Sequence, residues 1–328
     1  MRMRNHCLLL TISFLFAATA GAQGKRPMTL VELLEVPQLS EPRISPDGRQ
    51  LLYELAEADW KANRRVSHIW RIDSDGSGQV QLTNGEQGEQ SPRWSPDGTR
   101  VAFVAERGDI EEEQIYLISN EVGEAVALTD HPTSVSDITW APDGGSIYFL
   151  AEEPLSEEEK RRKEAKDDVF AYDEDYKQQH LWKVSVEDGT EVRITGGDFS
   201  ILEYRLSRDG SRIAHHRAPT PLIDDRDEGE VWLMNADGTG ATQLTRNSVP
   251  EQGAELSPDN AQVLFISDSN EEFTYYYNGN LFLVPSRGGG HRLMLKEMSH
   301  EVDEAHWSEN GKSIFIVANM GVHTELFE

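Results

Sequence analysis

Residues 91–104 read Ser-Pro-Arg-Trp-Ser-Pro-Asp-Gly-Thr-Arg-Val-Ala-Phe-Val, and the central turn, Ser95-Pro96-Asp97-Gly98, recurs along the chain. Six copies are present, with start-to-start spacings of 50, 46, 66, 50 and 51 residues. The other five are Ser45-Pro46-Asp47-Gly48, Ala141-Pro142-Asp143-Gly144, Ser207-Arg208-Asp209-Gly210, Ser257-Pro258-Asp259-Asn260 and Ser308-Glu309-Asn310-Gly311. Self-similarity at such an interval indicates an architecture of repeated units.

Each unit has the pattern of four short antiparallel strands. Proline presets φ at the second turn position, Asp or Asn suits the third, and Gly or Asn takes the left-handed one. A β-branched and aromatic run follows the turn, as in residues 101–104, and a second run comes later, as in residues 115–118. A short final strand ends in Leu82-Thr83, Leu128-Thr129, Ile194-Thr195 or Leu244-Thr245. Such units predict an all-β fold, a β-propeller with about six visible four-stranded blades.

The 66-residue interval contains a charged insertion, residues 152–179, in the third blade. Ser156 and Glu159 have the spacing of a capping box. The pairs Glu157–Arg161, Glu158–Arg162 and Glu159–Lys163 favour a helix, which we predict from about Ser156 to Asp168. Two roles stay open for it: a solvated excursion, or a contact with a neighbouring domain or the central pore.

The N-terminus has the pattern of a secretory signal peptide. Arg2 and Arg4 precede an apolar run over residues 7–18, and Ala20-Gly21-Ala22 supplies small residues for cleavage before Gln23. The run is too short to span a membrane. We therefore predict a signal peptide over residues 1–22 and no membrane attachment after its cleavage.

The remaining chain divides into two predicted regions. Residues 23–40 are expected to form a short helix, begun by the Thr29–Glu32 capping box, and a lead-in strand. Residues 41–328 are expected to form the propeller, incomplete at its C-terminus because the sixth unit ends within its third strand, at about Thr324 to Phe327.

The net charge limits the classes of binding partner that we expect, and the cysteine content indicates the cellular compartment. The chain has 31 Lys and Arg against 58 Asp and Glu, a net charge of −27, which disfavours binding to nucleic acid or to an anionic membrane. Its single cysteine, Cys7, lies in the predicted signal peptide. A mature chain without cysteine suits export to a periplasm or to the cell exterior.

The opening from Met28 to Leu34, with the turn at residues 45–48, resembles the N-terminus of bacterial prolyl oligopeptidase-family serine peptidases of the acylaminoacyl-peptidase and dipeptidyl-aminopeptidase type. Three further stretches agree: Asp59-Trp60-Lys61-Ala62-Asn63-Arg64-Arg65-Val66-Ser67-His68-Ile69-Trp70, residues 91–98, and the insertion from Ala151-Glu152-Glu153-Pro154-Leu155 to Lys166-Asp167-Asp168. The resemblance covers essentially the whole mature chain. The turn motif is shared with TolB-like propellers, whereas the first and third stretches are more specific.

This resemblance implies a two-domain enzyme, in which the propeller caps a C-terminal α/β-hydrolase domain with a Ser-Asp-His triad and admits peptides or small acylated substrates. Such a domain needs a G-x-S-x-G nucleophile elbow. Gly145-Ser146 and Gly210-Ser211 lack the second glycine, and Gly76-Ser77-Gly78 belongs to a hairpin turn. We therefore predict no catalytic, cofactor-binding or metal-binding residue in this chain. The triad is expected beyond Glu328, and this polypeptide alone is expected to be inactive.

Several other groups have a structural and a functional interpretation. His215-His216 could suggest a metal, but adjacent strand residues point to opposite faces. Asp73-Ser74-Asp75-Gly76 resembles part of a calcium loop but lacks the first and last ligands. Gly288-Gly289-Gly290-His291 fits a blade hairpin better than an oxyanion hole.

Two acidic pairs, Glu152-Glu153 and Glu271-Glu272, could bind the free amino terminus of a substrate, as an acidic pair does in dipeptidyl peptidases of the family the chain resembles. Solvated carboxylates are the simpler interpretation of both. Trp94, Trp140 and Trp307 occur once per unit and are expected to pack between blades. A TolB-like periplasmic propeller that binds or scaffolds other proteins stays open as the alternative function.

Overall fold

The computed structural model describes residues 26–328 except positions 122, 168, 170, 172 and 173. The predicted signal peptide lies outside the described residues. Helix α1 (Leu30–Glu35) belongs to a unit that ends at Val36, and the propeller unit begins at Pro37. The predicted capping box is present: the Thr29 side chain accepts from the backbone N–H of Glu32, and the Glu32 side chain accepts from that of Thr29.

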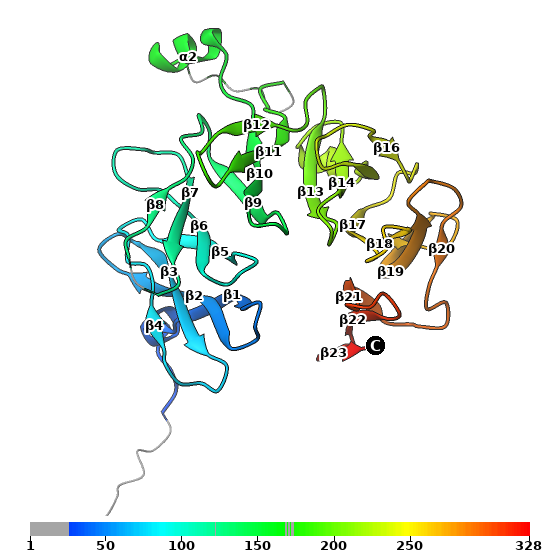
Figure 1. Cartoon of the computed structure of the whole chain (residues 1–328), viewed down its shortest axis with the longest axis horizontal. Helices are drawn as coiled ribbons and strands as arrows, with labels where there is room; N and C mark the ends of the chain where they lie inside the picture. The colour runs from blue at the N-terminus through cyan, green and yellow to red at the C-terminus, as the bar shows by residue number, and fades with distance from the viewer. Residues whose placement is uncertain (1–25, 122, 168, 170, 172–173) are drawn as a thin grey trace, which may run out of the picture. The chain divides into compact units, whose positions relative to one another are not determined.

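The described residues of the propeller unit form six antiparallel sheets, each with its strands in chain order (Figure 1). Blade 1 consists of β1 (Gln38–Ile44), β2 (Gln50–Asp59), β3 (Arg64–Asp73) and β4 (Val80–Gln81), and blade 2 of β5 (Glu89–Trp94), β6 (Arg100–Ala105), β7 (Gln114–Ser119) and β8 (Val126–Ala127). Blade 3 consists of β9 (Val135–Trp140), β10 (Ser146–Glu152), β11 (Gln179–Ser185) and β12 (Glu191–Arg193), and blade 4 of β13 (Ser200–Leu206), β14 (Arg212–Ala218), β15 (Glu230–Asn235) and β16 (Thr242–Gln243). Blade 5 consists of β17 (Glu251–Leu256), β18 (Gln262–Ser269), β19 (Tyr275–Pro285) and β20 (Arg292–Leu293), and blade 6 of β21 (Glu301–Trp307), β22 (Ile314–Asn319) and β23 (Thr324–Phe327). This confirms the predicted β-propeller.

Side-chain hydrogen bonds explain why the turn motif recurs. In blade 2, the Ser95 hydroxyl donates to Asp97 Oδ1 (2.6 Å) and accepts from the backbone N–H of Arg100 (2.9 Å). Gly98 has φ +70°, the left-handed conformation that glycine adopts without a Cβ clash. The same serine-centred bonds occur at Ser45, Ser207, Ser257 and Ser308.

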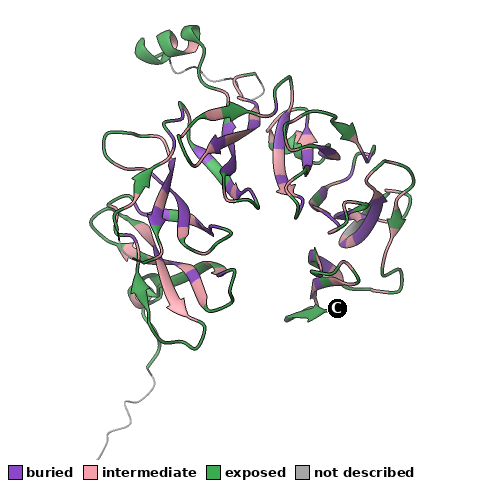
Figure 2. Cartoon of the chain, viewed as in Figure 1, coloured by how far each residue is buried: buried purple, intermediate pink, exposed green. Residues whose placement is uncertain are grey.

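Apolar residues of consecutive blades pack into shared clusters, and the buried positions are concentrated in the strands (Figure 2). The predicted tryptophans lie at these contacts. The Trp94 indole N–H donates to the Arg43 carbonyl of blade 1 (2.9 Å), and that of Trp140 donates to the Arg93 carbonyl of blade 2 (3.2 Å). Each bond joins the first strands of neighbouring blades, so these tryptophans fix one blade against the next.

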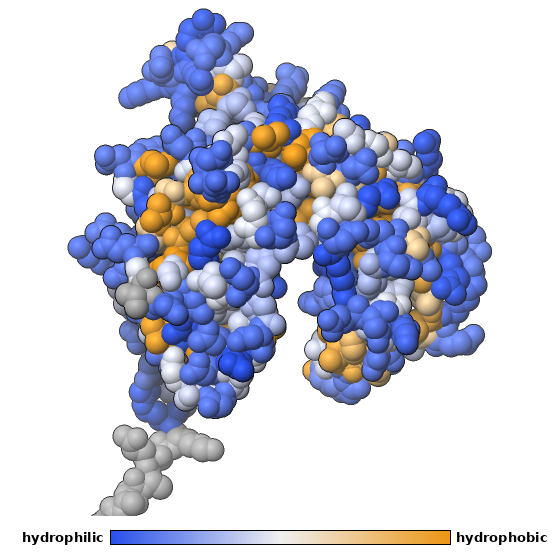
Figure 3. Space-filling model, in the orientation of Figure 1, coloured by the Kyte–Doolittle hydropathy of each residue, from blue (hydrophilic) through white to orange (hydrophobic). Residues whose placement is uncertain are grey.

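The insertion contains helix α2 (Glu157–Glu164), capped by Ser156 and Glu159 as predicted. The helix ends four residues before the expected Asp168, because Lys166 takes a left-handed φ of +55°. The three predicted i,i+4 ion pairs are not formed among these described side chains: Lys160 pairs with Glu157 (2.8 Å), and Glu159 pairs with Lys177 outside the helix. The helix buries none of its residues and is almost wholly hydrophilic (Figure 3).

A further short helix, α3 (Ile223–Arg226), lies in the connection between β14 and β15 and has no counterpart in the sequence predictions. No helix in the described part of the chain combines the length and the apolar character that a membrane span requires.

Candidate functional site

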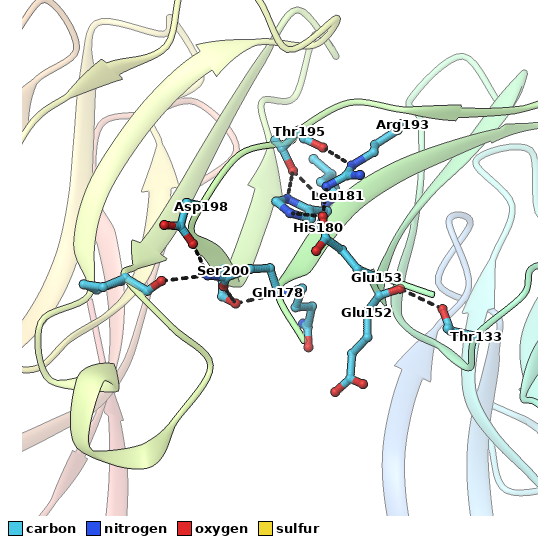
Figure 4. Close-up of polar contacts among 12 residues, drawn as sticks. Thr133, Glu152, Glu153, Gln178, His180, Leu181, Arg193, Thr195, Asp198 and Ser200 are labelled. Carbon is cyan, nitrogen blue, oxygen red and sulfur yellow. Dashed lines mark hydrogen bonds and ion pairs between the residues drawn. The ribbon is translucent and has the colours of Figure 1, made fainter. Parts of the chain in front are cut away.

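The Glu152-Glu153 pair lies where β10 leads into the insertion. The Glu153 carboxylate accepts from Arg193 Nη2 (2.7 Å) and lies 3.5 Å from His180 Nε2. The Glu152 side chain extends away from Glu153, while its backbone carbonyl accepts from Thr133 Oγ1 (2.8 Å) (Figure 4). Because the two carboxylates diverge and Glu153 is already paired, this pair forms no joint site for an amino group.

His180 places an imidazole between a hydroxyl and a carboxylate. Its Nδ1 lies 3.3 Å from Thr195 Oγ1, and its Nε2 faces Glu153 (Figure 4). The ring is buried, with 1% of its surface exposed. Burial, followed by the charge of Arg193, lowers the pKa of His180 to about 4, so the ring is neutral at pH 7. A hydroxyl, an imidazole and a carboxylate in line resemble the order of a catalytic triad.

Repetition identifies this arrangement as structural. In four blades the threonine that follows the fourth strand accepts a hydrogen bond of 2.8–2.9 Å from a backbone N–H of the third strand. The pairs are Thr83 with Ile69, Thr129 with Ile115, Thr195 with Leu181, and Thr245 with Val231. The neighbouring side chain varies: Gln114 beside Thr129 and Glu251 beside Thr245. The hydroxyl therefore satisfies a buried backbone donor in each of these blades.

Replacing Thr195 by Val should lower the free energy of unfolding by about 1–2 kcal/mol, because the buried N–H of Leu181 loses its acceptor. Chemical unfolding measures the loss. Thr242, which is exposed, is the matched control, and T242V should change stability by less than about 0.5 kcal/mol. Equal losses in the two variants would contradict the structural role.

The two carboxylates of the second acidic pair, Glu271-Glu272, also have different surroundings. Glu271 pairs with Lys296 (2.6 Å), and Glu272 is exposed. His291, the end of the glycine-rich run, lies 2.7 Å from the Glu271 carbonyl and packs against Phe273. This run connects β19 to β20, which is the hairpin position that the sequence predicted.

The remaining motifs also occupy structural positions. In the Asp73-Ser74-Asp75-Gly76 segment, Gly76 N donates to the Asp73 carbonyl (2.9 Å), which closes the turn between β3 and β4. His215 and His216 are buried on β14, and His216 Nδ1 lies 2.6 Å from Glu203 Oε1. Among the described residues, no three His, Cys, Asp or Glu side chains converge in a way that could hold a metal ion.

Sequence reasoning missed a line of charged residues on the first strands, which we call the inner-strand charges: Glu41, Arg43, Arg93, Glu203, Arg205, Glu255 and His306. Glu41 pairs with Arg43 of its own strand (2.6 Å) and with Arg93 of blade 2 (2.9 Å). Each first strand carries a register shift close to these positions. An acidic or polar residue two positions before a charged one, as in Glu41-x-Arg43 and Glu203-x-Arg205, is the signal that could have found them.

Three blades meet within this line. Arg205 of blade 4 donates to Glu255 of blade 5 (2.8 Å) and lies 3.1 Å from His306 Nδ1 of blade 6. Burial alone would raise the pKa of Glu255, but the hydrogen bond from His306 and the charge of Arg205 outweigh it and lower that pKa. Glu255 is therefore ionised at neutral pH. The inner-strand charges thus include paired groups of both signs.

Comparisons with known proteins match this chain to a propeller family and to two peptidases. Residues 68–215 match a family described as the lipoprotein LpqB β-propeller domain. The chain is 32% identical over 105 residues to the uncharacterized peptidase YuxL of Bacillus subtilis, covering 32% of this chain and 16% of that protein. It is also 32% identical over 90 residues to dipeptidyl-peptidase 5 of Porphyromonas gingivalis, covering 27% of this chain and 13% of that protein. The chain thus spans less than a fifth of the length of these relatives.

Solved structures share the fold. The acylaminoacyl peptidase of Pyrococcus horikoshii superposes with a TM-score of 0.64 at 16% identity, covering 90% of this chain and 44% of that one. The putative TolB of Agrobacterium tumefaciens gives a TM-score of 0.52 at 18% identity, covering 78% of this chain and 80% of that one. At these identities the likeness shows a β-propeller. The sequence matches to peptidases add that the chain resembles the propeller domains of such enzymes.

Proposed function

We propose that this chain is the substrate-gating propeller of an exported serine peptidase that cleaves peptides or acylated peptides. The observation that carries the proposal is the 32% identity over 105 residues to a protein named as a peptidase. The fold supports it, because the propeller of an acylaminoacyl peptidase covers 90% of this chain. The partner in the full product would be an α/β-hydrolase domain that holds the Ser-Asp-His triad.

In this proposal the propeller excludes folded proteins, and the hydrolase domain performs the chemistry. The inner-strand charges would give an entering peptide alternating donors and acceptors along the first strands. Export would depend on residues 1–22, and the mature protein would reside in a periplasm or outside the cell.

The first experiment is to sequence the source gene beyond the codon for Glu328. We expect an open frame that reaches a G-x-S-x-G elbow followed by Asp and His. The full product should then hydrolyse short peptidyl and acyl-peptidyl substrates, should be inactivated by a serine-directed phosphonate, and should leave folded proteins intact. A stop codon directly after Glu328, or a full product that the phosphonate does not label, would refute the peptidase proposal.

The alternative is a TolB-like scaffold, favoured by one observation: the chain covers 80% of a putative TolB structure. A frame that ends with a completed propeller would support this alternative. Export can be tested separately by fractionating cells that express the chain with and without residues 1–22. We expect only the form with residues 1–22 to leave the cytoplasm.

A further inference from the structure

Arg217, on β14 of blade 4, is held between two aromatic side chains. Its guanidinium carbon lies 3.5 Å from the centre of the Phe199 ring and 4.5 Å from that of Trp232. All three side chains are half-buried. Contacts with two rings fix the plane of the guanidinium, which leaves its N–H groups to donate from the edge.

No carboxylate completes this arrangement. Among the described residues, the Arg217 guanidinium has neither an ion pair nor a hydrogen bond, although the chain contains 58 Asp and Glu. Two carboxylates of neighbouring segments bond to other groups: Glu230, the ladder partner of Arg217, accepts from the Asn247 backbone N–H, and Asp198 accepts from Gln178 (3.2 Å). Burial lowers the pKa of Arg217, as expected of a cation without a compensating charge.

Three other arginines lie over aromatic rings, and two of them also pair with a carboxylate; Arg100, over Trp140, has no ion pair among the described residues. Arg107 stacks on Phe103 and Tyr116, at 5.1 Å from each ring, and pairs with Glu89 (2.5 Å).

Arg193 lies 5.9 Å from the Trp182 ring and pairs with Glu153 (2.7 Å). In both cases an aromatic ring packs against the guanidinium, and a carboxylate accepts hydrogen bonds from the guanidinium N–H groups. Arg217 has the closest ring contacts of the four and lacks the carboxylate.

We propose that Arg217 binds the carboxylate of a peptide, which takes the place that Glu89 and Glu153 occupy beside two of the other arginines. A carboxylate matches the planar fork of donors. A phosphate dianion would meet stronger repulsion from a chain of net charge −27, with Asp198 and Glu230 close by in the fold. The carboxylate could come from the C-terminus of a peptide or from an Asp or Glu side chain. This inference goes beyond the proposed function, because it concerns binding by the propeller itself.

The test is calorimetric titration of the chain with inorganic phosphate and with three peptides: trialanine as the free acid, trialanine amide, and N-acetyl-Ala-Asp-Ala amide. We expect the free acid to bind at least tenfold more tightly than trialanine amide. Tight binding of the aspartyl peptide would show that a side-chain carboxylate suffices, and weak binding would assign the site to C-termini. Equal affinities for trialanine and its amide, or preferential binding of inorganic phosphate, would overturn the proposal.

Variants locate the site. R217Q should lose the preference for the free acid, and R217K should lose most of it, because lysine lacks the fork of donors. Arg100, which lies 5.6 Å from the Trp140 ring only, is the matched control, and R100Q should bind like the wild type. If R217Q fails to fold, W232L keeps the charge and removes one ring, and its affinity for trialanine should fall several-fold. An unchanged preference in R217Q would refute the assignment.

Discussion

Replacing Phe265 by Ala should lower the free energy of unfolding by about 3–5 kcal/mol. Phe265 lies in β18 with none of its surface exposed. Its ring stacks on Phe282 of β19, with centroids 5.3 Å apart and planes at 15°, and it also contacts Phe273. Truncation to Ala removes these contacts and leaves a cavity between blades 4 and 5, whose residues share this cluster.

Denaturant unfolding followed by circular dichroism measures this loss. Phe315 offers a matched control, because it is also a phenylalanine on a second strand but is 38% exposed. F315A should cost less than about 1 kcal/mol. A loss in F265A no larger than that in F315A would contradict the assignment of Phe265 to the core.

Local chemistry made the blades predictable from sequence. The serine-centred turn is closed by bonds within five residues, such as Ser95 to Asp97 and Arg100, so its geometry is determined wherever the residues occur. The capping boxes at Thr29 and Ser156 are equally local, and both were found. The C-terminal end of α2 was misplaced because the i,i+4 pairs that favoured a longer helix are not formed among the described side chains, and Lys166 takes a left-handed φ of +55°.

The candidate site was less predictable because it depends on neighbours about 50 residues away. Arg205 meets Glu255 and His306 only after three blades have packed together. The Glu152-Glu153 pair shows the reverse error, since residues adjacent in sequence were considered as one acidic site. At the end of a strand, consecutive side chains point to opposite faces, and Glu153 is taken by Arg193.

The chain should be most stable in mildly acidic solution, because a buried carboxyl lies between blades 4 and 5. Glu251 accepts from Thr245 Oγ1 (2.6 Å) and from Asn247 Nδ2 (2.6 Å), and it is 8% exposed. Burial raises the pKa of Glu251 to about 7, although the hydrogen bonds from Thr245 and Asn247 oppose this shift. Burial also raises the pKa of Glu230, whose carboxylate accepts from the Asn247 backbone N–H.

The sign of the effect follows from proton binding. Between the ordinary pKa of 4.5 and the raised pKa of about 7, folded Glu251 keeps its proton while the unfolded chain has released it. Stability therefore falls as pH rises through this window and levels off above it. A pKa raised from 4.5 to about 7 corresponds to about 3 kcal/mol, at about 1.4 kcal/mol for each tenfold change in proton affinity.

Replacing Glu251 by Gln should remove most of this slope, because glutamine resembles the protonated carboxyl and never ionises. E251Q should match the wild type near pH 5 and exceed its unfolding free energy by up to about 3 kcal/mol at pH 8. Denaturant unfolding at intervals from pH 5 to 8 measures both curves. E255Q is a control for which the opposite change in stability is expected. His306 and Arg205 lower the pKa of Glu255 despite its burial, so removing this negative charge should destabilise the chain at neutral pH. Two results would contradict this prediction: a wild-type stability that rises between pH 5 and 7, or an E251Q variant that is less stable than the wild type at pH 8. Either result would show that Glu251 is ionised in the folded chain, because its hydrogen bonds outweigh the cost of burying the charge.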